Sequence, residues 1–216
     1  MAKSHRPAKA HYNLIAGESV ERLAALSDGI FAVAMTLLVL DLRVPGAQAI
    51  RTDGQLRAQL LTLLPQLAAY MMSFLTLGIF WNGQQAQLNR FSRNNRHLTW
   101  VHLLFLFAVT MMPFSTKLLA DFIRYRTALV CYWMNIAALG AVLYGSWIYA
   151  KRANLLKPDT THEIDCAVRR RILTAQGLYA FGALLCIWDT YASIGFIALV
   201  QLNFVIAPPL GILRRI

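Results

Sequence analysis

The chain has 216 residues, of which 57% are hydrophobic and only 14% carry a charge, against about 25% in an ordinary soluble domain. Together with a mean hydropathy of +0.48, this composition excludes a typical soluble domain and indicates a protein that crosses the membrane several times. The net charge of +11 does not indicate a nucleic-acid partner, because no DNA- or RNA-binding motif accompanies it and membrane proteins collect Lys and Arg on their cytoplasmic loops.

Six apolar stretches follow one another along the chain, and a helix needs about 20 such residues to cross a bilayer. The fifth and sixth are separated only around Asp189, which predicts a hairpin with a short turn. The sequence therefore predicts an all-α integral membrane protein in which residues 1–216 form a single six-helix transmembrane domain. The predicted helices are residues 23–42, 60–81, 98–119, 128–150, 172–188 and 191–213.

Lys and Arg are distributed unequally between the two sides of this domain. If the N-terminus is cytoplasmic, 15 of the 21 basic residues lie on the cytoplasmic side and 6 on the outer side. Positive charge is enriched in cytoplasmic loops, so this bias predicts that both termini are cytoplasmic. The first twenty residues are polar and basic, and we do not expect a cleaved signal peptide.

Polar residues stand at the front end of the first apolar stretch, RLAALSDGIFAVAMTLLVLDL (residues 22–42). A charge deep in the bilayer costs about 2.5–3.5 kcal/mol on insertion scales, so Arg22 and Asp28 need partners there. The two are six residues apart and point in different directions, so they are poor partners for each other within one helix. We expect both to find partners on other helices or subunits, unless Arg22 extends to the lipid headgroups.

Candidate partners occur at the same depth. The second stretch ends in WNGQQ and the third begins near two histidines, and both of these ends are predicted to be cytoplasmic. A hydrogen-bonded network among such groups can offset the cost of burying them. The residues that we assign to this network are Arg22, Ser27, Asp28, Trp81, Gln84 and His102.

A stripe of branched apolar side chains occupies another face of the first helix. Ile30, Val33, Leu37 and Leu40 are spaced by 3, 4 and 3 residues, and Thr36 lies beside them. Such a stripe is usually a packing seam in a helix bundle, and periodicity alone does not distinguish a seam from the wall of a pore. Ser27 and Asp28 lie more than about 100° away from Val33 and must face other helices.

Signals for other classes of protein are missing. The three cysteines, Cys131, Cys166 and Cys186, are far apart, without metal-binding or redox spacing, and we expect them to be unpaired. The sequence contains no Gly-rich phosphate loop, no HExxH and no GxSxG motif. We therefore expect neither enzymatic activity nor a cofactor.

The first helix resembles that of the transmembrane protein 175 family of potassium channels, whose pattern is R-x-x-x-F-S-D. Arg22, Ser27 and Asp28 match this pattern, and Leu26 replaces the usual Phe. The stretches YMMSFLTLGIFWNGQQ and LLFLFAVTMMPFSTKLLADF resemble the second and third helices of the family. Gln84 stands where many relatives have a His. Whether this chain retains the role that the His has in those relatives is therefore left open.

The resemblance implies a potassium-permeable channel without the TVGYG filter of ordinary potassium channels. Bacterial members have one six-helix repeat and assemble as tetramers, so the resemblance implies a homotetramer in the bacterial plasma membrane. Its partners would be other copies of itself, membrane lipids and potassium ions, and its first helices would line a central pore. The alternative function is a secondary transporter or exporter of a small solute, although the repeats and broken helices typical of carriers are not evident.

The same resemblance assigns the stripe to the ion pathway. Val33 holds the apolar position that constricts the pore in this family, and K⁺ would bind transiently near the Thr36 hydroxyl. A narrow apolar ring can lose its water and act as a gate. Because selectivity would then depend on pore radius and hydroxyl ligands, we expect a moderate preference for K⁺ over Na⁺. The predicted pore-lining residues are Ile30, Val33, Thr36, Leu37 and Leu40.

Overall fold

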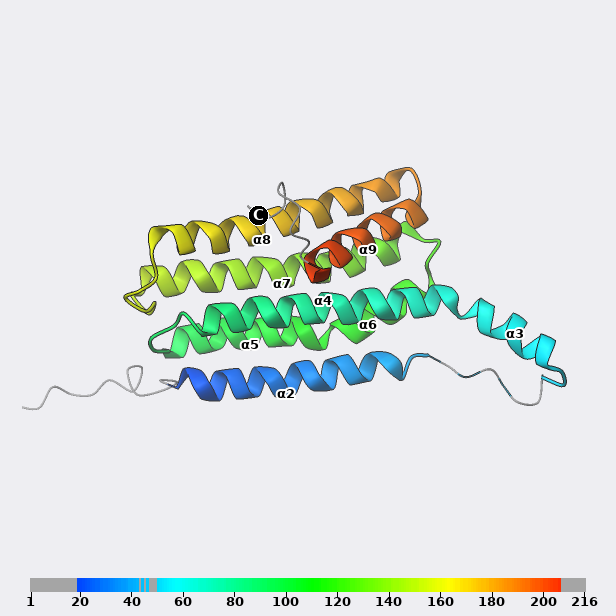
Figure 1. The fold of residues 1–216 in the computed structure, drawn as a ribbon, viewed down its shortest axis with the longest axis horizontal. Helices are drawn as coiled ribbons and strands as arrows, with labels where there is room; N and C mark the ends of the chain where they lie inside the picture. The colour runs from blue at the N-terminus through cyan, green and yellow to red at the C-terminus, as the bar shows by residue number, and fades with distance from the viewer. Residues whose placement is uncertain (1–18, 43, 45, 47–49, 207–216) are drawn as a thin grey trace, which may run out of the picture.

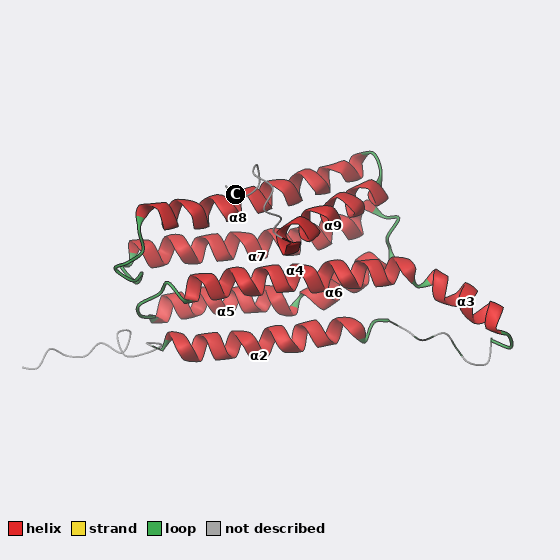
Figure 2. Ribbon diagram, in the orientation of Figure 1, coloured by secondary structure: helices red, strands yellow, loops and turns green. Residues whose placement is uncertain are grey.

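The computed structural model describes residues 19–42, 44, 46 and 50–206. All the regular elements of this part of the chain are helices (Figure 2), and a single isolated bridge pairs Phe91 with Leu156. In chain order the helices are α2 (Val20–Val39), α3 (Asp53–Thr62), α4 (Leu64–Leu88), α5 (Arg96–Thr110), α6 (Met112–Asp121), α7 (Arg126–Arg152), α8 (His162–Leu184), the 3₁₀ turn η2 (Leu185–Ile187) and α9 (Thr190–Ile206).

Capping residues and prolines mark where these helices begin and break. Ser19, Asn95 and Thr161 cap α2, α5 and α8, each by accepting a hydrogen bond from the backbone N–H three residues later. Pro65 and Pro113 each follow a break, between α3 and α4 and between α5 and α6, because proline donates no backbone hydrogen bond and fits only the first turn of a helix. α5 and α6 together form one interrupted rod.

The helices lie side by side in a bundle (Figure 1), with α2 at one edge and α8 at the other. The start of α2, the end of α4, the start of α5, the end of α7 and the start of α8 gather at one end of the bundle, at the left in Figure 1. These are the ends that the Lys and Arg distribution assigns to the cytoplasm. α3 projects away from the opposite end, and none of its residues is buried.

The predicted helices correspond to α2, α4, the α5–α6 rod, α7, α8 and α9, but two boundaries were wrong. The second helix begins at Leu64 and continues to Leu88, seven residues beyond its predicted end, because its last turns are polar yet packed. The fifth begins at His162, ten residues earlier than predicted, because α8 continues as a charged helix past its apolar part. The predicted residues 207–213 lie outside the described residues.

Four of the helical rods are long and apolar enough to cross a membrane: α2, α4, α5–α6 and α7. α9 is a shorter apolar helix of 17 residues, and the first half of α8 carries many charges. The structure therefore gives a multi-helix membrane bundle, while six crossings per chain remain a prediction.

A network of buried hydroxyl and amide groups joins four helices near the middle of the bundle. Thr116 donates to Ser73 at 2.6 Å, and Gln201 donates to Thr76 at 2.6 Å. The Tyr132 hydroxyl lies 3.3 Å from Ser73 and 3.2 Å from Thr76. All five side chains are buried, where unpaired polar groups are costly, so this network fixes α4, α6, α7 and α9 against one another.

Candidate functional site: the first helix and its anchors

Asp28 anchors α2 to α4. Its Oδ1 accepts a hydrogen bond of 2.8 Å from the indole Nε1 of Trp81 and another of 2.6 Å from Nε2 of Gln85. The two donors are four residues apart, so they project from the same face of α4. Bonds to an ionised carboxylate are stronger than bonds between neutral groups, which makes this contact a specific link between the two helices.

A second chain of hydrogen bonds begins one residue earlier and lies deeper. The Ser27 hydroxyl donates to the Leu23 carbonyl at 3.0 Å and accepts from Nε2 of Gln84 at 3.0 Å. The same amide nitrogen lies 3.2 Å from Nδ1 of His102, whose Nε2 lies 3.1 Å from the Ser146 hydroxyl. This buried chain connects α2, α4, α5 and α7.

The direction of these bonds follows from the donors present. The Gln84 amide nitrogen carries two hydrogens, one for Ser27 and one for Nδ1 of His102. Nδ1 then accepts, which leaves the proton on Nε2 to donate to Ser146. Five of the six residues assigned to the network from the sequence are thus brought together, in two adjacent groups.

Arg22 is not brought together with them. Its backbone N–H bonds to the Ser19 hydroxyl at 3.1 Å, as part of the helix cap. Its side chain is exposed, and among residues 19–42, 44, 46 and 50–206 it has no hydrogen bond or ion pair. At the end of the bundle assigned to the cytoplasm, Arg22 has the position of a side chain that extends to headgroups or to a neighbouring chain.

The network also contains two residues that were not assigned to it. Gln85 is among the candidate partners in WNGQQ but not in the set assigned to the network, although its spacing supports it, because it lies one helical turn after Trp81 and shares its face. Ser146 carries no local signal, since a serine within an apolar helix is common and only the packing of α7 against α5 places it beside His102.

The apolar stripe lies on a different side of α2, about 100° around the helix from the buried face. The helix packs into the bundle through Leu23, Ser27, Phe31, Ala34 and Leu38. By contrast, Val33 is 58% exposed and Leu40 is 73% exposed. Leu37 and Thr36 are also exposed, and Ile30 is half-buried. In a single chain, four of the five predicted pore-lining residues are therefore uncovered, and Ile30 lies at the edge of the packed face.

An open groove of about 410 Å³ follows this surface. Gly29, Ile30, Val33 and Leu37 are among the residues of α2 that line it, and Thr110 of α5 forms part of its other wall. The hydroxyl of Thr36, on the same exposed side of α2, donates its hydrogen to the Val33 carbonyl at 2.8 Å. Since the hydrogen is used in this bond, the oxygen lone pairs remain available as ligands for a cation.

Comparisons with known proteins identify the chain's relatives. The family model described as "Endosomal/lysosomal potassium channel TMEM175" matches residues 22–113. A potassium channel of Chamaesiphon minutus is 30% identical over 188 residues, which are 85% of this chain and 92% of that protein. A potassium channel of Streptomyces collinus is 32% identical over 191 residues, 87% of this chain and 84% of that protein.

The fold agrees with a solved structure of the same kind. The crystal structure of a lysosomal potassium-selective channel TMEM175 homolog from Chamaesiphon minutus superposes with a TM-score of 0.76 at 29% identity. The similarity covers 87% of this chain and 97% of that one. Since a 30% identical relative is matched over nearly its whole length and the fold agrees as well, the chain belongs to the TMEM175 family of membrane channels.

Proposed function

We propose that this chain forms a potassium-permeable cation channel in the bacterial plasma membrane, as a homotetramer whose α2 helices line a central pore. The single observation that carries the proposal is the division of α2 into two faces. One face is fixed in the bundle by hydrogen bonds and packing, while most of the apolar stripe on another side of the helix is uncovered in the single chain. The names of the bacterial relatives, both potassium channels, supply the permeant ion.

The constriction is formed by apolar side chains. Four copies of Val33 around an axis make a ring of branched side chains, and Leu37 and Leu40 form further rings toward the outer end. A narrow apolar ring excludes water unless the pore widens, so small movements of α2 open and close the path. Val is smaller than Leu or Ile, which favours a slightly wider constriction than those residues would give.

Selectivity between K⁺ and Na⁺ depends on the radius of the pore and on a small number of oxygen ligands. The available lone pairs of Thr36 replace part of the hydration shell of an ion that passes near the ring. A single ring of hydroxyls replaces less of that shell than the stacked carbonyl rings of a TVGYG filter. The channel therefore prefers K⁺ over Na⁺ only moderately.

The Asp28 and Ser27 contacts set the position of α2 and do not touch the ion. They lie on the side of the helix that faces α4, so their bonds fix its tilt and rotation. A membrane helix can retain the Asp28 carboxylate and the Ser27 hydroxyl because each accepts hydrogen bonds from donors on a neighbouring helix.

Purified protein in liposomes and planar bilayers tests the proposal. A channel produces unitary current steps, and the reversal potential follows the K⁺ gradient more closely than the Na⁺ gradient. The subunit number, measured on the same preparation by native mass spectrometry, should be four. Flux without resolvable steps would instead favour the transporter, and absence of ion flux from an intact assembly would exclude both functions.

A further inference from the structure

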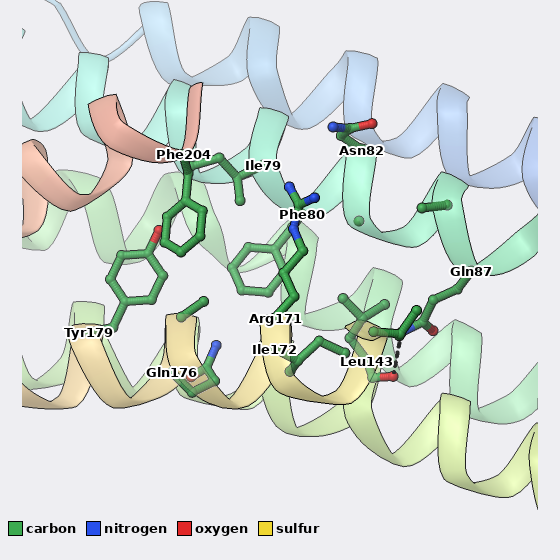
Figure 3. A pocket seen from close by; sticks show the side chains of 14 residues that line it. Ile79, Phe80, Asn82, Gln87, Leu143, Arg171, Ile172, Gln176, Tyr179 and Phe204 are labelled. Atoms are coloured by element: carbon green, nitrogen blue, oxygen red, sulfur yellow. Dashed lines mark hydrogen bonds between the residues drawn. The ribbon is translucent and has the colours of Figure 1, made fainter. Parts of the chain in front are cut away.

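A second, partly open cavity lies away from α2 and is lined by residues of α4, α7, α8 and α9 (Figure 3). Its volume is about 140 Å³. For comparison, an apolar cavity of about 150 Å³ in a protein core holds one benzene molecule. The space therefore fits one segment of a hydrocarbon chain. None of the residues that line it takes part in the α2 anchors or the predicted ion pathway.

The two ends of this cavity differ in chemistry. Gln87 lies at one end, Tyr179 and Phe204 form the other, and the Arg171 side chain lies between them (Figure 3). Arg171 and Tyr179 are eight residues apart on α8, a separation of about 12 Å along the helix. Arg171 also lies at the junction between the charged and apolar parts of α8, directly before the predicted membrane segment 172–188. This is the depth of the lipid headgroups on the side assigned to the cytoplasm.

The charge of Arg171 has no carboxylate partner within the described part of the chain. Figure 3 shows the Arg171 side chain extending from α8 toward α4, and its guanidinium group forms no ion pair with a carboxylate of any described residue. Arg171 is itself an exposed residue, and it differs from its two neighbours in lining the cavity. Arg169 bonds to the Tyr144 hydroxyl at 3.3 Å, and Arg170, which is also exposed, does not line the cavity.

Two polar atoms of the lining are buried and unpaired. Gln87 is 1% exposed, and its Nε2 donates to the Leu143 carbonyl at 3.2 Å, but its Oε1 has no hydrogen-bond partner among the described residues. The hydroxyl of Tyr179, also 1% exposed, has none among them either. An unpaired buried acceptor is costly, so Gln87 Oε1 indicates a ligand that brings a hydrogen-bond donor to this end of the cavity.

From this arrangement we propose that the cavity binds an anionic phospholipid of the cytoplasmic leaflet whose headgroup carries hydroxyls, of the phosphatidylglycerol class. The phosphate binds Arg171, a headgroup hydroxyl donates to Gln87 Oε1, and one acyl chain enters the space between Ala175, Ile79 and Phe204. A free fatty acid fits less well, because its carboxylate offers no donor to Gln87. Only the assignment of the leaflet rests on the proposed channel topology.

Binding at this site would hold α8 against α4. The same α4 carries Trp81, Gln84 and Gln85, which position α2 through Asp28 and Ser27. A lipid bound at the edge of the bundle therefore stabilises the helix on which the α2 anchors depend.

Lipid binding to the delipidated full-length assembly tests the site without any measurement of current. Native mass spectrometry follows titration with dioleoyl phosphatidylglycerol, dioleoyl phosphatidylcholine and oleate. Wild type should bind the phosphatidylglycerol lipid most tightly, at one site per chain. Arg171→Gln should weaken that binding about fivefold, as expected for one Arg at a membrane surface. Its matched control is Arg170→Gln, which changes net charge equally but should bind as wild type does.

A second pair of variants tests the acyl-chain space. Ala175→Phe fills the cavity and should reduce binding, whereas Ala167→Phe, at an exposed position of α8 outside the cavity, should not. Equal losses in Arg171→Gln and Arg170→Gln, equal affinity for the two phospholipids, or tighter binding of oleate would each overturn the proposal. Because lipid affinity is read directly, failure here is distinguishable from failure of the channel function.

Discussion

The indole nitrogen of Trp81 donates a hydrogen bond of 2.8 Å to the carboxylate of Asp28, and this bond joins two helices at an exposed position. Gln85 adds a second donor to the same oxygen at 2.6 Å. A carboxylate with two donors is held in one position, and the helix that carries it is held with it. The consequences of removing this carboxylate therefore concern the placement of α2.

Asp28→Ala is expected to lower assembly and stability before it changes permeation. The loss of two hydrogen bonds to a carboxylate costs about 1–3 kcal/mol, and it frees the rotation of α2. Size-exclusion yield and the apparent melting temperature of the purified assembly measure the effect. Asp53→Ala is the matched control, because its ion pair with Arg57 is exposed and contributes little. If Asp28→Ala instead gave normal amounts of intact assembly with altered ion selectivity, Asp28 would belong to the ion path.

Val33→Ala is expected to raise conductance, because a smaller side chain widens the constriction and lowers the cost of wetting it. The control is Val39→Ala, the same change on the same helix, at an exposed position outside the stripe. Single-channel conductance in planar bilayers is the measurement. Equal conductance in wild type and Val33→Ala, with the assembly intact, would remove Val33 from the pore lining.

Thr36→Val is expected to lower the K⁺/Na⁺ permeability ratio while the assembly persists. Valine keeps the size and branching of threonine but removes the oxygen whose lone pairs are available to an ion. Thr62→Val is the control, because Thr62 makes the same bond to the carbonyl three residues earlier, on the exposed helix α3. Reversal potentials under bi-ionic conditions give the ratio, and an unchanged ratio would exclude Thr36 as an ion ligand.

The sequence locates the apolar helices of the bundle because polar or charged residues separate their apolar stretches. It does not show where they end, because a helix continues through polar residues wherever caps and packing support it. α8 illustrates this: Thr161 caps a helix whose first half is charged, ten residues before the apolar part begins. The last turns of α4 are polar for another reason, since Gln84 and Gln87 are buried partners of neighbouring helices.

Periodicity also leaves the faces of α2 ambiguous. The buried set (Leu23, Ser27, Phe31, Ala34 and Leu38) and the exposed stripe both have helical spacing, so either could have packed into the bundle. What separates them is Ser27 on the buried side, which is paired with Gln84. The family resemblance, and not the spacing, assigned the stripe that includes Val33 and Leu37 to the ion pathway. Partners such as Ser146 depend on long-range packing, for which the sequence has no local signal.

Gly182→Ala is expected to destabilise the contact between α8 and α9. A Cβ at this position would lie 2.8 Å from Cγ1 of Ile197, a fully buried side chain, and 3.0 Å from the ring of Phe196. Such overpacking costs about 1–3 kcal/mol. Gly177→Ala on the same helix has open space around its Cβ and should be neutral or slightly stabilising. Thermal unfolding of both variants tests this prediction. Equal melting temperatures of Gly182→Ala and Gly177→Ala would contradict the close approach of α9 to Gly182.

Asp165 links α7 to α8 at the end of the bundle assigned to the cytoplasm, ahead of the predicted membrane segment of α8. Its carboxylate accepts from Nε1 of Trp147 at 2.8 Å and from Nζ of Lys151 at 2.7 Å. Burial alone would raise the pKa of this carboxyl, but the hydrogen bonds from Lys151 and Trp147 and the nearby positive charges outweigh it and lower the pKa below its ordinary 3.8.

A carboxyl whose pKa is lower in the folded state stabilises the fold fully above its ordinary pKa, and that contribution disappears as the pH falls through the folded value. Asp165→Asn should therefore melt at a lower temperature than wild type at pH 7. The difference should stay constant down to about pH 5 and shrink only below the ordinary pKa of 3.8. Asp159→Asn, which removes an exposed partner of Arg90, is the control and should have little effect at any pH. A wild-type advantage that is already lost between pH 7 and 5 would show that the carboxyl has a raised pKa and that burial, not the Lys151 and Trp147 bonds, dominates.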